Sequence, residues 1–227
     1  ARDKVLAKKI LTYHHIRVPA FVEFERGKRL KIPKHMPYPV IVKPVGEDAS
    51  EGIARASLVR RDAELARRVG FVHESVGRDA IAEEYVEGRE IFCSVLGNDR
   101  LRVLPLRTVW LGTKPGRPKF LTYRLKWNTD YQQKWGLEFG FAADLPDETA
   151  ERIGRVSKRV YRALELRDYG RIDLRVTPEG RIYVLEANPN PFLAKSEDFA
   201  ESAQEAGIDY PELVERIMSL ALKRVRR

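Results

Sequence analysis

Three side chains with oxygen ligands occur close together near the end of the chain: Asp173, Glu186 and Asn188. Carboxylate and amide oxygens are the ligands that a hard cation such as Mg²⁺ prefers in proteins, and Mn²⁺ accepts the same donors. Glu186 could bridge two ions while Asp173 and Asn188 each complete a coordination shell. If the fold brings these side chains together, the sequence predicts a magnesium site.

A hairpin over residues 170–192 is the element that would bring the three side chains together. Residues 171–176 alternate charged and apolar side chains at period two, which predicts a half-buried strand. The sequence TPEG at residues 177–180 is typical of a turn, because Pro presets φ and Gly supplies a permissive backbone. Residues 181–186 are then expected to return as a second strand.

The register of this hairpin decides which side chains meet. With four loop residues, Arg171 would lie across from Glu186, Asp173 would be diagonal to it, and Asn188 would extend the same row. The alternative is a surface hairpin, in which the acids simply pair with Arg171 and Arg175.

A second group of residues, in the N-terminal half, could contact phosphate. A buried strand is predicted over residues 39–44, and Lys43 lies at its end. The following loop is bracketed by Gly46 and Gly52 and contains Ser50. A lysine at a strand end can reach phosphate oxygens, while loop amides and a serine hydroxyl donate to them. The spacing is not that of a P-loop.

The remaining patterns predict the elements that would position these residues. Asp3 can cap a helix over residues 4–13. A second helix is expected over residues 62–69, ended by Gly70. Strand-like segments at residues 80–86 and 91–96 are separated by a glycine, which suggests a hinge between two lobes.

The C-terminal half is predicted to be more irregular at first and then helical. Residues 112–140 have no clear period and are expected to form a long functional loop, because their aromatic content argues against disorder. Asp147 is placed to cap a helix that reaches residue 164. Two more helices are predicted over residues 196–206 and 211–222.

Composition indicates the class of protein. The chain has 227 residues, of which 43% are hydrophobic and 33% charged, as expected for a soluble globular protein. Without a visible signal peptide or apolar span, and with Cys93 as its one cysteine, it is expected in the reducing cytoplasm. Its net charge of +9 favours anionic partners. Most basic residues are interspersed with acids, and only residues 223–227 form a basic cluster.

Five motifs occur in one order along the chain: IVKP, EEYVEGRE, TYRLKWN, GRIDLRV and LEANPNP. In order and approximate spacing they resemble the ATP-grasp superfamily, and most of all its D-alanine–D-alanine ligase branch. The resemblance runs from Asp3 to about Ala221. It implies an α+β ATP-grasp fold in which two α+β lobes grip ATP. Residues 1–87 would form the small lobe and residues 88–227 the C-terminal lobe.

The resemblance also implies which residues bind the phosphates of ATP. Lys43 and Lys4 resemble the two lysines that contact the α- and β-phosphates. Ser50 is similar to the hydroxyl contact in the loop that covers the phosphates. Lys126 resembles a lysine that closes on the γ-phosphate.

The nucleoside of ATP would bind near the hinge. The resemblance implies that the hinge reads adenine chiefly through backbone groups and that an acid binds the ribose. Apolar walls would enclose the base. The residues that match these parts are the hinge Glu83, Glu84, Tyr85 and Val86, the acid Glu90, and the walls Ile41, Tyr85 and Leu185.

The same resemblance implies the reaction. Asp173, Glu186 and Asn188 match magnesium ligands, and Arg171 matches the arginine that stabilises an acyl phosphate and the tetrahedral intermediate. Phosphoryl transfer to a carboxylate brings two anions together, so metal and guanidinium charge must offset their repulsion. A fixed arginine suits an oxyanion better than a mobile lysine would.

Several departures from the ligase pattern bear on the substrate. The ligases carry another domain ahead of the matched stretch, so part of the substrate site is expected to be absent or supplied from elsewhere. Glu84 replaces a lysine that is usual at the hinge. The turn after Asn188 contains prolines and Phe192 instead of a glycine amide. Glu197 aligns with the serine that would hold an acceptor carboxylate, and an acid there would repel that group.

The resulting prediction is an ATP- and Mg²⁺-dependent ligase core that joins a carboxylate to an amine through an acyl phosphate, forming a C–N bond. Its expected partners are ATP and small carboxylate and amine substrates, with a second copy of the chain as an option and no membrane. One alternative is a nucleotide-binding remnant with only weak ATPase or ligase activity. An alternative of another class is a basic nucleic-acid-binding module, in which basic residues and stacking aromatics would share one sheet face.

Overall fold

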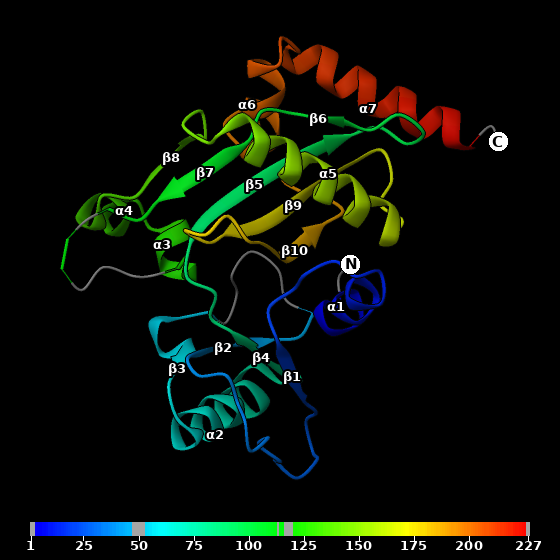
Figure 1. The fold of residues 1–227 in the computed structure, drawn as a ribbon. Helices are drawn as coiled ribbons and strands as arrows, with labels where there is room; N and C mark the ends of the chain where they lie inside the picture. Colours follow the sequence, from blue (N-terminus) through cyan, green and yellow to red (C-terminus); the bar gives the residue numbers. More distant parts are fainter. Residues whose placement is uncertain (1–2, 47–52, 113, 116–119, 226–227) are drawn as a thin grey trace.

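The computed structural model describes residues 3–46, 53–112, 114–115 and 120–225. In this part of the chain the strands form two antiparallel sheets, one of four strands and one of six. Figure 1 shows the smaller sheet at the bottom of the molecule and the larger one above it, which gives the predicted α+β fold with two lobes. Among the described helices, none is long and apolar enough to cross a bilayer.

The smaller sheet places Lys43 on the face that looks towards the larger sheet. Its strands have the order β1-β4-β2-β3. Val40 and Val42 are buried against the helix α2, and because side chains alternate along a strand, Ile41 and Lys43 point the other way. Glu83 lies directly opposite Ile41 and shares this second face. The elements of this lobe are β1 (Phe21–Phe24), β2 (Val40–Pro44), β3 (Leu58–Val59), α2 (Asp62–Phe71) and β4 (Ala80–Glu84).

The larger sheet buries one face and presents polar residues on the other. Its strands have the order β10-β9-β5-β7-β8, and β6 pairs with β5. Cys93, Ile172 and Leu174 belong to the core that packs against α5, which Figure 1 shows in front of this sheet. The elements are β5 (Arg89–Leu96), β6 (Arg102–Val103), β7 (Arg107–Trp110), β8 (Glu138–Phe141), α5 (Asp147–Ala163), β9 (Tyr169–Val176) and β10 (Ile182–Asn188).

The register of the β9–β10 hairpin differs from the predicted one. β9 ends at Val176 and β10 begins at Ile182, so the loop has one residue more than the four predicted. A shift of one residue alone would turn Glu186 to the opposite face, but a bulge before Glu186 adds a second residue and restores the face. Glu186 therefore lies opposite Asp173 rather than Arg171, and Asn188 lies opposite Arg171.

The N-terminal helix α1 (Lys4–Tyr13) connects the two lobes. Asp3 caps it as predicted, accepting a hydrogen bond from the backbone N–H of Leu6 at 2.9 Å. Leu11 is buried in the core of the larger sheet, although the helix precedes the smaller sheet in the chain. Lys4 and Lys8 are also buried, at 8% and 2% exposure. The division of the chain at residue 87 stays a prediction.

Other boundaries required correction. Gly70 does not end α2, because the chain continues through a π-helical turn, Val72–Val76, and stops at Gly77, whose φ is 74°. Asp147 is the first residue of α5, and Pro146 is its N-cap. Residues 112–140 are not all irregular: they contain α3 (Tyr123–Trp127), α4 (Thr129–Trp135) and the start of β8. The other two helices are α6 (Asp198–Glu205) and α7 (Tyr210–Val225), and a short 3-10 turn covers Arg55–Ser57.

Candidate active site

A cavity of about 540 Å³ lies between the two sheets and collects most of the residues predicted from the sequence. Lys4 lies beside it, in an ion pair with Glu186. Ser50 and most of its glycine-bracketed loop lie outside the described residues. The predicted residues that line the cavity are Ile41, Lys43, Glu83, Glu84, Tyr85, Val86, Glu90, Lys126, Arg171, Asp173, Leu185, Glu186 and Asn188.

Three lysines and two glutamates form a cluster where α1 and the small sheet meet β10; Lys43 and Glu186 are partly exposed and the other three are buried. The ammonium of Lys43 lies 2.9 Å from one oxygen of Glu83, and that of Lys8 lies 3.6 Å from the other. Lys4 lies 2.8 Å from Glu186. We call these five residues the lysine cluster. Because three lysines face two glutamates, the cluster carries one surplus positive charge.

The electrostatics of the lysine cluster favour ionised side chains in contact. Burial opposes the charge of Glu83, yet the nearby charges of Lys43 and Lys8 hold its pKa below the usual range. Burial likewise opposes the charge of Lys43, and Glu83 holds its pKa above normal. Burial lowers the pKa of Lys8, which Glu83 offsets only in part. A surplus of buried cations suits a bound polyanion such as a polyphosphate.

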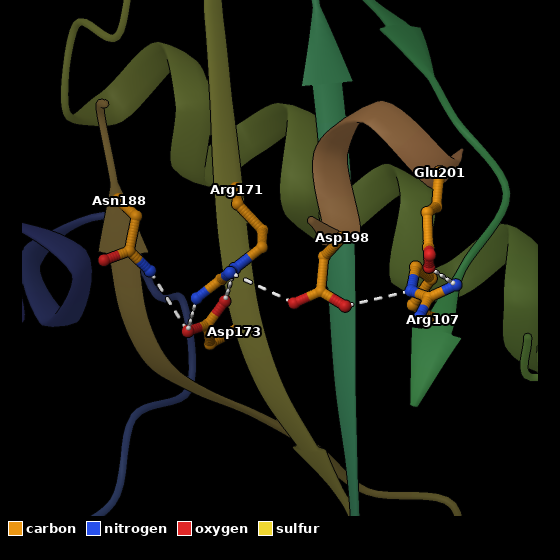
Figure 2. Close-up of polar contacts among 6 residues, drawn as sticks. All are labelled: Arg107, Arg171, Asp173, Asn188, Asp198 and Glu201. Carbon is orange, nitrogen blue, oxygen red and sulfur yellow. Dashed lines mark hydrogen bonds and ion pairs between the residues drawn. The ribbon is translucent and has the colours of Figure 1, made fainter. Parts of the chain in front are cut away.

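The opposite end of the cavity is built on the polar face of the larger sheet, shown in Figure 2. Arg171 donates from Nε to Asp173 Oδ1 at 2.7 Å and from Nη2 to Asp173 Oδ2 at 2.9 Å. Asn188 donates to the same Oδ2 at 3.0 Å. Burial would lower the pKa of Arg171, but the charge of Asp173 raises it above its usual value.

Asp173, Glu186 and Asn188 have the donor types for a divalent cation. Glu186 is the cross-strand neighbour of Asp173, and Asn188 contacts Asp173 directly. Among the described residues, no group of three or more His, Cys, Asp or Glu side chains could hold a metal, so the third ligand would be the amide oxygen of Asn188. Lys4 and Arg171 now hold the two acids. The set fits Mg²⁺ if these cations move aside when the ion binds.

Comparison with known proteins decides the family. Residues 9–219 match the family model described as "D-ala D-ala ligase C-terminus". The chain belongs to this family. It is 32% identical to the uncharacterized protein y4sG of Sinorhizobium fredii, over 98% of this chain and 63% of the relative. It is 30% identical to D-alanine–D-alanine ligase A of Chromobacterium violaceum, over 99% of this chain and 59% of that ligase. The chain therefore spans about three fifths of the length of these two relatives.

Solved structures agree with this membership. A crystal structure of D-alanine–D-alanine ligase from Bacillus anthracis, complexed with ATP, superposes with a TM-score of 0.80 at 26% identity. The match covers 99% of this chain and 67% of that ligase. A second structure of the same ligase has a TM-score of 0.81 at 28% identity. The ATP-grasp fold predicted from the motifs is therefore confirmed.

In this family member a buried ion pair that sequence reasoning missed also lines the cavity. Arg175 donates to Glu90 at 2.6 Å and to the carbonyl of Gly88 at 3.2 Å. The guanidinium Nε of Arg175 is buried and has no hydrogen-bond partner among the described residues. Burial raises the pKa of Glu90, which the charge of Arg175 only partly opposes. The sequence signal for this ion pair was the position of Arg175, two residues after Asp173 on the same strand face.

The hinge uses part of its backbone for its own structure. The N–H of Glu84 donates to the carbonyl of Ala20 at 2.7 Å, and that of Tyr85 donates to the carbonyl of Pro39 at 2.9 Å. The side chain of Glu83 contacts Lys43 and Lys8. If the hinge binds a base through its backbone, it must therefore use groups other than the N–H of Glu84 and the N–H of Tyr85.

Lys126 lies on α3 rather than in a loop, at the edge of the cavity. Its ammonium is 5.5 Å from the ring centre of Trp127, which is in edge contact with Phe192 at 6.0 Å. The structure thus brings an aromatic pair to the side of the cavity where the chain turns after Asn188. Phe192 and Asn190 both line the cavity there.

Two further residues at the site were not predicted. Lys8 donates to the carbonyl of Leu185, the residue at the bulge, at 3.1 Å. Its position four residues after Lys4 on one helix face was a usable signal. Asp198 lines the cavity, whereas the neighbouring Glu197 does not and is the N-cap of α6. The acid of this pair that reaches the cavity is therefore Asp198, and only the packing of α6 reveals it.

Proposed function

We propose that this chain is the core of an ATP- and Mg²⁺-dependent ligase that activates a carboxylate as an acyl phosphate and joins it to an amine. The observation that carries the proposal is the division of one cavity into two charged ends. Lys43 lines one end, with Lys4 and Lys8 behind it. Asp173, Asn188 and Arg171 line the other end, and Glu186 lies between the two, paired with Lys4 and opposite Asp173. Family membership and the likeness to a ligase structure complexed with ATP support it.

In this proposal the lysine cluster receives the polyphosphate. Lys43 and Lys4 would exchange part of their contact with Glu83 and Glu186 for phosphate oxygens. Lys8 would keep Glu83 ionised by remaining its buried neighbour at 3.6 Å. Lys126, at the cavity edge, would approach the γ-phosphate. These contacts place the phosphoryl group for transfer and offset its negative charge.

Asp173, Glu186 and Asn188 would hold the magnesium ions. Bound Mg²⁺ supplies charge that offsets the repulsion between a phosphoryl group and a carboxylate. Arg171 would bind the carboxylate oxygen and stabilise the oxyanion that develops when the amine attacks. A planar guanidinium can do this with two parallel hydrogen bonds.

The protein itself need not supply a nucleophile. The one cysteine, Cys93, lies on the α5 face of the larger sheet, away from the cavity, and burial raises the pKa of its thiol to about 12. The activated carboxylate is instead attacked by the amine substrate, and phosphate leaves with the electron pair of the acyl–oxygen bond. The substrates that fit are small carboxylates and amines, because the cavity must also accommodate the nucleotide.

Calorimetry with ATP, with and without Mg²⁺, tests the nucleotide and metal. Binding should depend on Mg²⁺ and should raise the melting temperature by mass action. Glu186→Gln should abolish ATP turnover and change the metal dependence, because it removes a charge shared with the ion. The proposal would be overturned if about millimolar Mg-ATP produced no binding heat and no melting shift.

Hydroxylamine trapping tests the chemistry. The protein is incubated with Mg-ATP and each member of a panel of small carboxylic acids, and hydroxamate is measured as the product of a trapped acyl phosphate. The expected result is hydroxamate that depends on ATP, on the acid and on Arg171. ATP binding without hydroxamate for any acid would favour the nucleotide-binding remnant.

A further inference from the structure

Arg171 has a second carboxylate partner that the proposed mechanism does not use. Its Nη1 lies 3.3 Å from Asp198 Oδ2, while Nε and Nη2 are directed at Asp173. Figure 2 shows the guanidinium lying between the two acids. The side chains of all three residues are nearly buried, with exposures of 12%, 12% and 15% for Arg171, Asp173 and Asp198.

Asp198 is itself held in place from the other side. Arg107 donates from Nε to Asp198 Oδ1 at 2.9 Å, and its Nη1 lies 2.6 Å from Glu201. Figure 2 shows the resulting row of alternating charges, which runs from α6 to Asn188. Asp198 is also the first residue of α6, and the next residue, Phe199, is buried in a core with Leu96 and Leu104. The position of this carboxylate is therefore set by the core and by Arg107.

Bidentate metal binding at Asp173 would displace Arg171 from this carboxylate. Both oxygens of Asp173 accept hydrogen bonds from the guanidinium, and Oδ2 also accepts from Asn188. A cation that binds both oxygens of Asp173 would take the place of the Nε and Nη2 hydrogen bonds of Arg171. A buried guanidinium that loses its partner without replacement is costly, because an uncompensated charge remains in a poorly solvated site.

We propose that Asp198 is a positioning residue that retains Arg171 when Asp173 turns its oxygens to the metal. The role rests on the proposed function, which places the metal at Asp173 and the oxyanion at Arg171. Nη1 is the nitrogen that Asp173 leaves unused, so the guanidinium can pivot towards Asp198 without leaving the cavity. Arg171 thereby remains beside the reacting groups. Metal binding is then coupled to the exchange of Arg171 from Asp173 to Asp198.

Mn²⁺ binding, measured by electron paramagnetic resonance at saturating non-hydrolysable ATP analogue, tests this exchange without turnover. Asp198→Asn should weaken Mn²⁺ binding about tenfold, because Arg171 then has no second carboxylate and stays on Asp173. Glu205→Gln is the matched control, since it removes an exposed acid from the same helix, and should change binding by less than about twofold.

The same substitution in an Arg171→Gln background separates positioning from a general charge effect. Without the guanidinium, Asp198→Asn should shift Mn²⁺ binding by less than about twofold. Equal losses in both backgrounds, or no loss in either, would overturn the role of Asp198. A wild-type chain that binds no Mn²⁺ with the analogue would overturn the proposed function itself, and this role with it.

A variant that leaves the cavity lining intact covers the case in which Asp198→Asn does not fold. Arg107→Lys keeps the positive charge beside Asp198 but loses the planar fork that fixes it. It should weaken Mn²⁺ binding several-fold in the wild-type background and leave it unchanged in the Arg171→Gln background. Unchanged binding in both backgrounds, in a protein that melts normally, would count against the proposal.

Discussion

The two ends of the cavity pair their charged side chains with different residue types. In the lysine cluster, Lys4, Lys8 and Lys43 face Glu83 and Glu186, at distances between 2.8 and 3.6 Å. On the sheet face, two arginines contact three acids, which gives one surplus negative charge. We call this second group the arginine chain; its members are Arg107, Arg171, Asp173, Asp198 and Glu201.

The sign of the surplus charge at each end matches the ligand that this end is proposed to bind. A surplus positive charge favours a polyphosphate, and a surplus negative charge favours a divalent cation. The difference in residue type matters as well. Lysines are point charges on flexible stems and can follow a phosphate, whereas arginine forks fix the plane in which a carboxylate is held. The cavity thus combines an end built on lysine point charges with an end built on arginine forks.

The largest expected effect is on the lysine cluster. Glu83→Gln removes the acid that lies between Lys43 and Lys8, at a position only 2% exposed. Breaking a buried ion pair from one side should lower the free energy of unfolding by about 3 kcal/mol. Urea unfolding monitored by circular dichroism measures this loss, with Glu205→Gln as an exposed control. A loss below about 1 kcal/mol would show that the cluster is solvated.

The next largest effect is expected for a substitution of Arg171, in the arginine chain. Arg171→Lys keeps the charge but removes the planar fork, so any ligase rate should fall about a hundredfold, as for the loss of an oxyanion donor. ATP affinity at saturating Mg²⁺ should stay within about twofold, because the phosphate contacts are proposed for lysines and not for Arg171. Hydroxamate formation and calorimetry give the two values. A parallel loss of ATP affinity would place Arg171 in the ground-state nucleotide site.

A smaller difference in ATP affinity is expected between substitutions of two lysines, Lys43 and Lys126. Lys43 is held by Glu83 at 2.9 Å on a strand, whereas the ammonium of Lys126 lies 5.5 Å from the ring centre of Trp127 at the cavity edge. The fixed cation loses less entropy on binding phosphate, so Lys43→Ala should weaken ATP about tenfold and Lys126→Ala clearly less. Isothermal titration of both variants provides the test. Equal losses would argue that the rigidity of Lys43 has no part in binding.

The smallest effect is a dependence on pH. Burial lowers the pKa of Lys8 from 10.5, so the folded protein releases this proton at a lower pH than the unfolded chain does. The stability contributed by this group should therefore rise with pH in the window below 10.5. The free energy of unfolding of the wild type, relative to Lys8→Met, should increase as the pH rises towards 10.5. Lys9→Met, an exposed change on the same helix, is the control, and a falling difference would contradict the assignment.

Much of the site could be read from local patterns. The cap at Asp3, the strand that ends with Lys43, and the hairpin that contains Asp173 and Glu186 all depend on residues near one another in the chain. Ordered motifs then identified the ATP-grasp family, which the family model and the solved structures confirm. These features are local, so period and turn chemistry are sufficient to predict them.

The pairings across the cavity depended on the tertiary structure. The longer loop and the bulge at Leu185 together set the partners of Glu186 and Asn188, because one extra residue in each kept the face but changed the register. Glu83 acquired Lys8 through the packing of α1, and Arg171 acquired Asp198 through the packing of α6, which begins 27 residues later. Sequence alone therefore determined which charged groups are available, whereas packing between distant elements decided which of them are buried together, because burial makes each pairing strong.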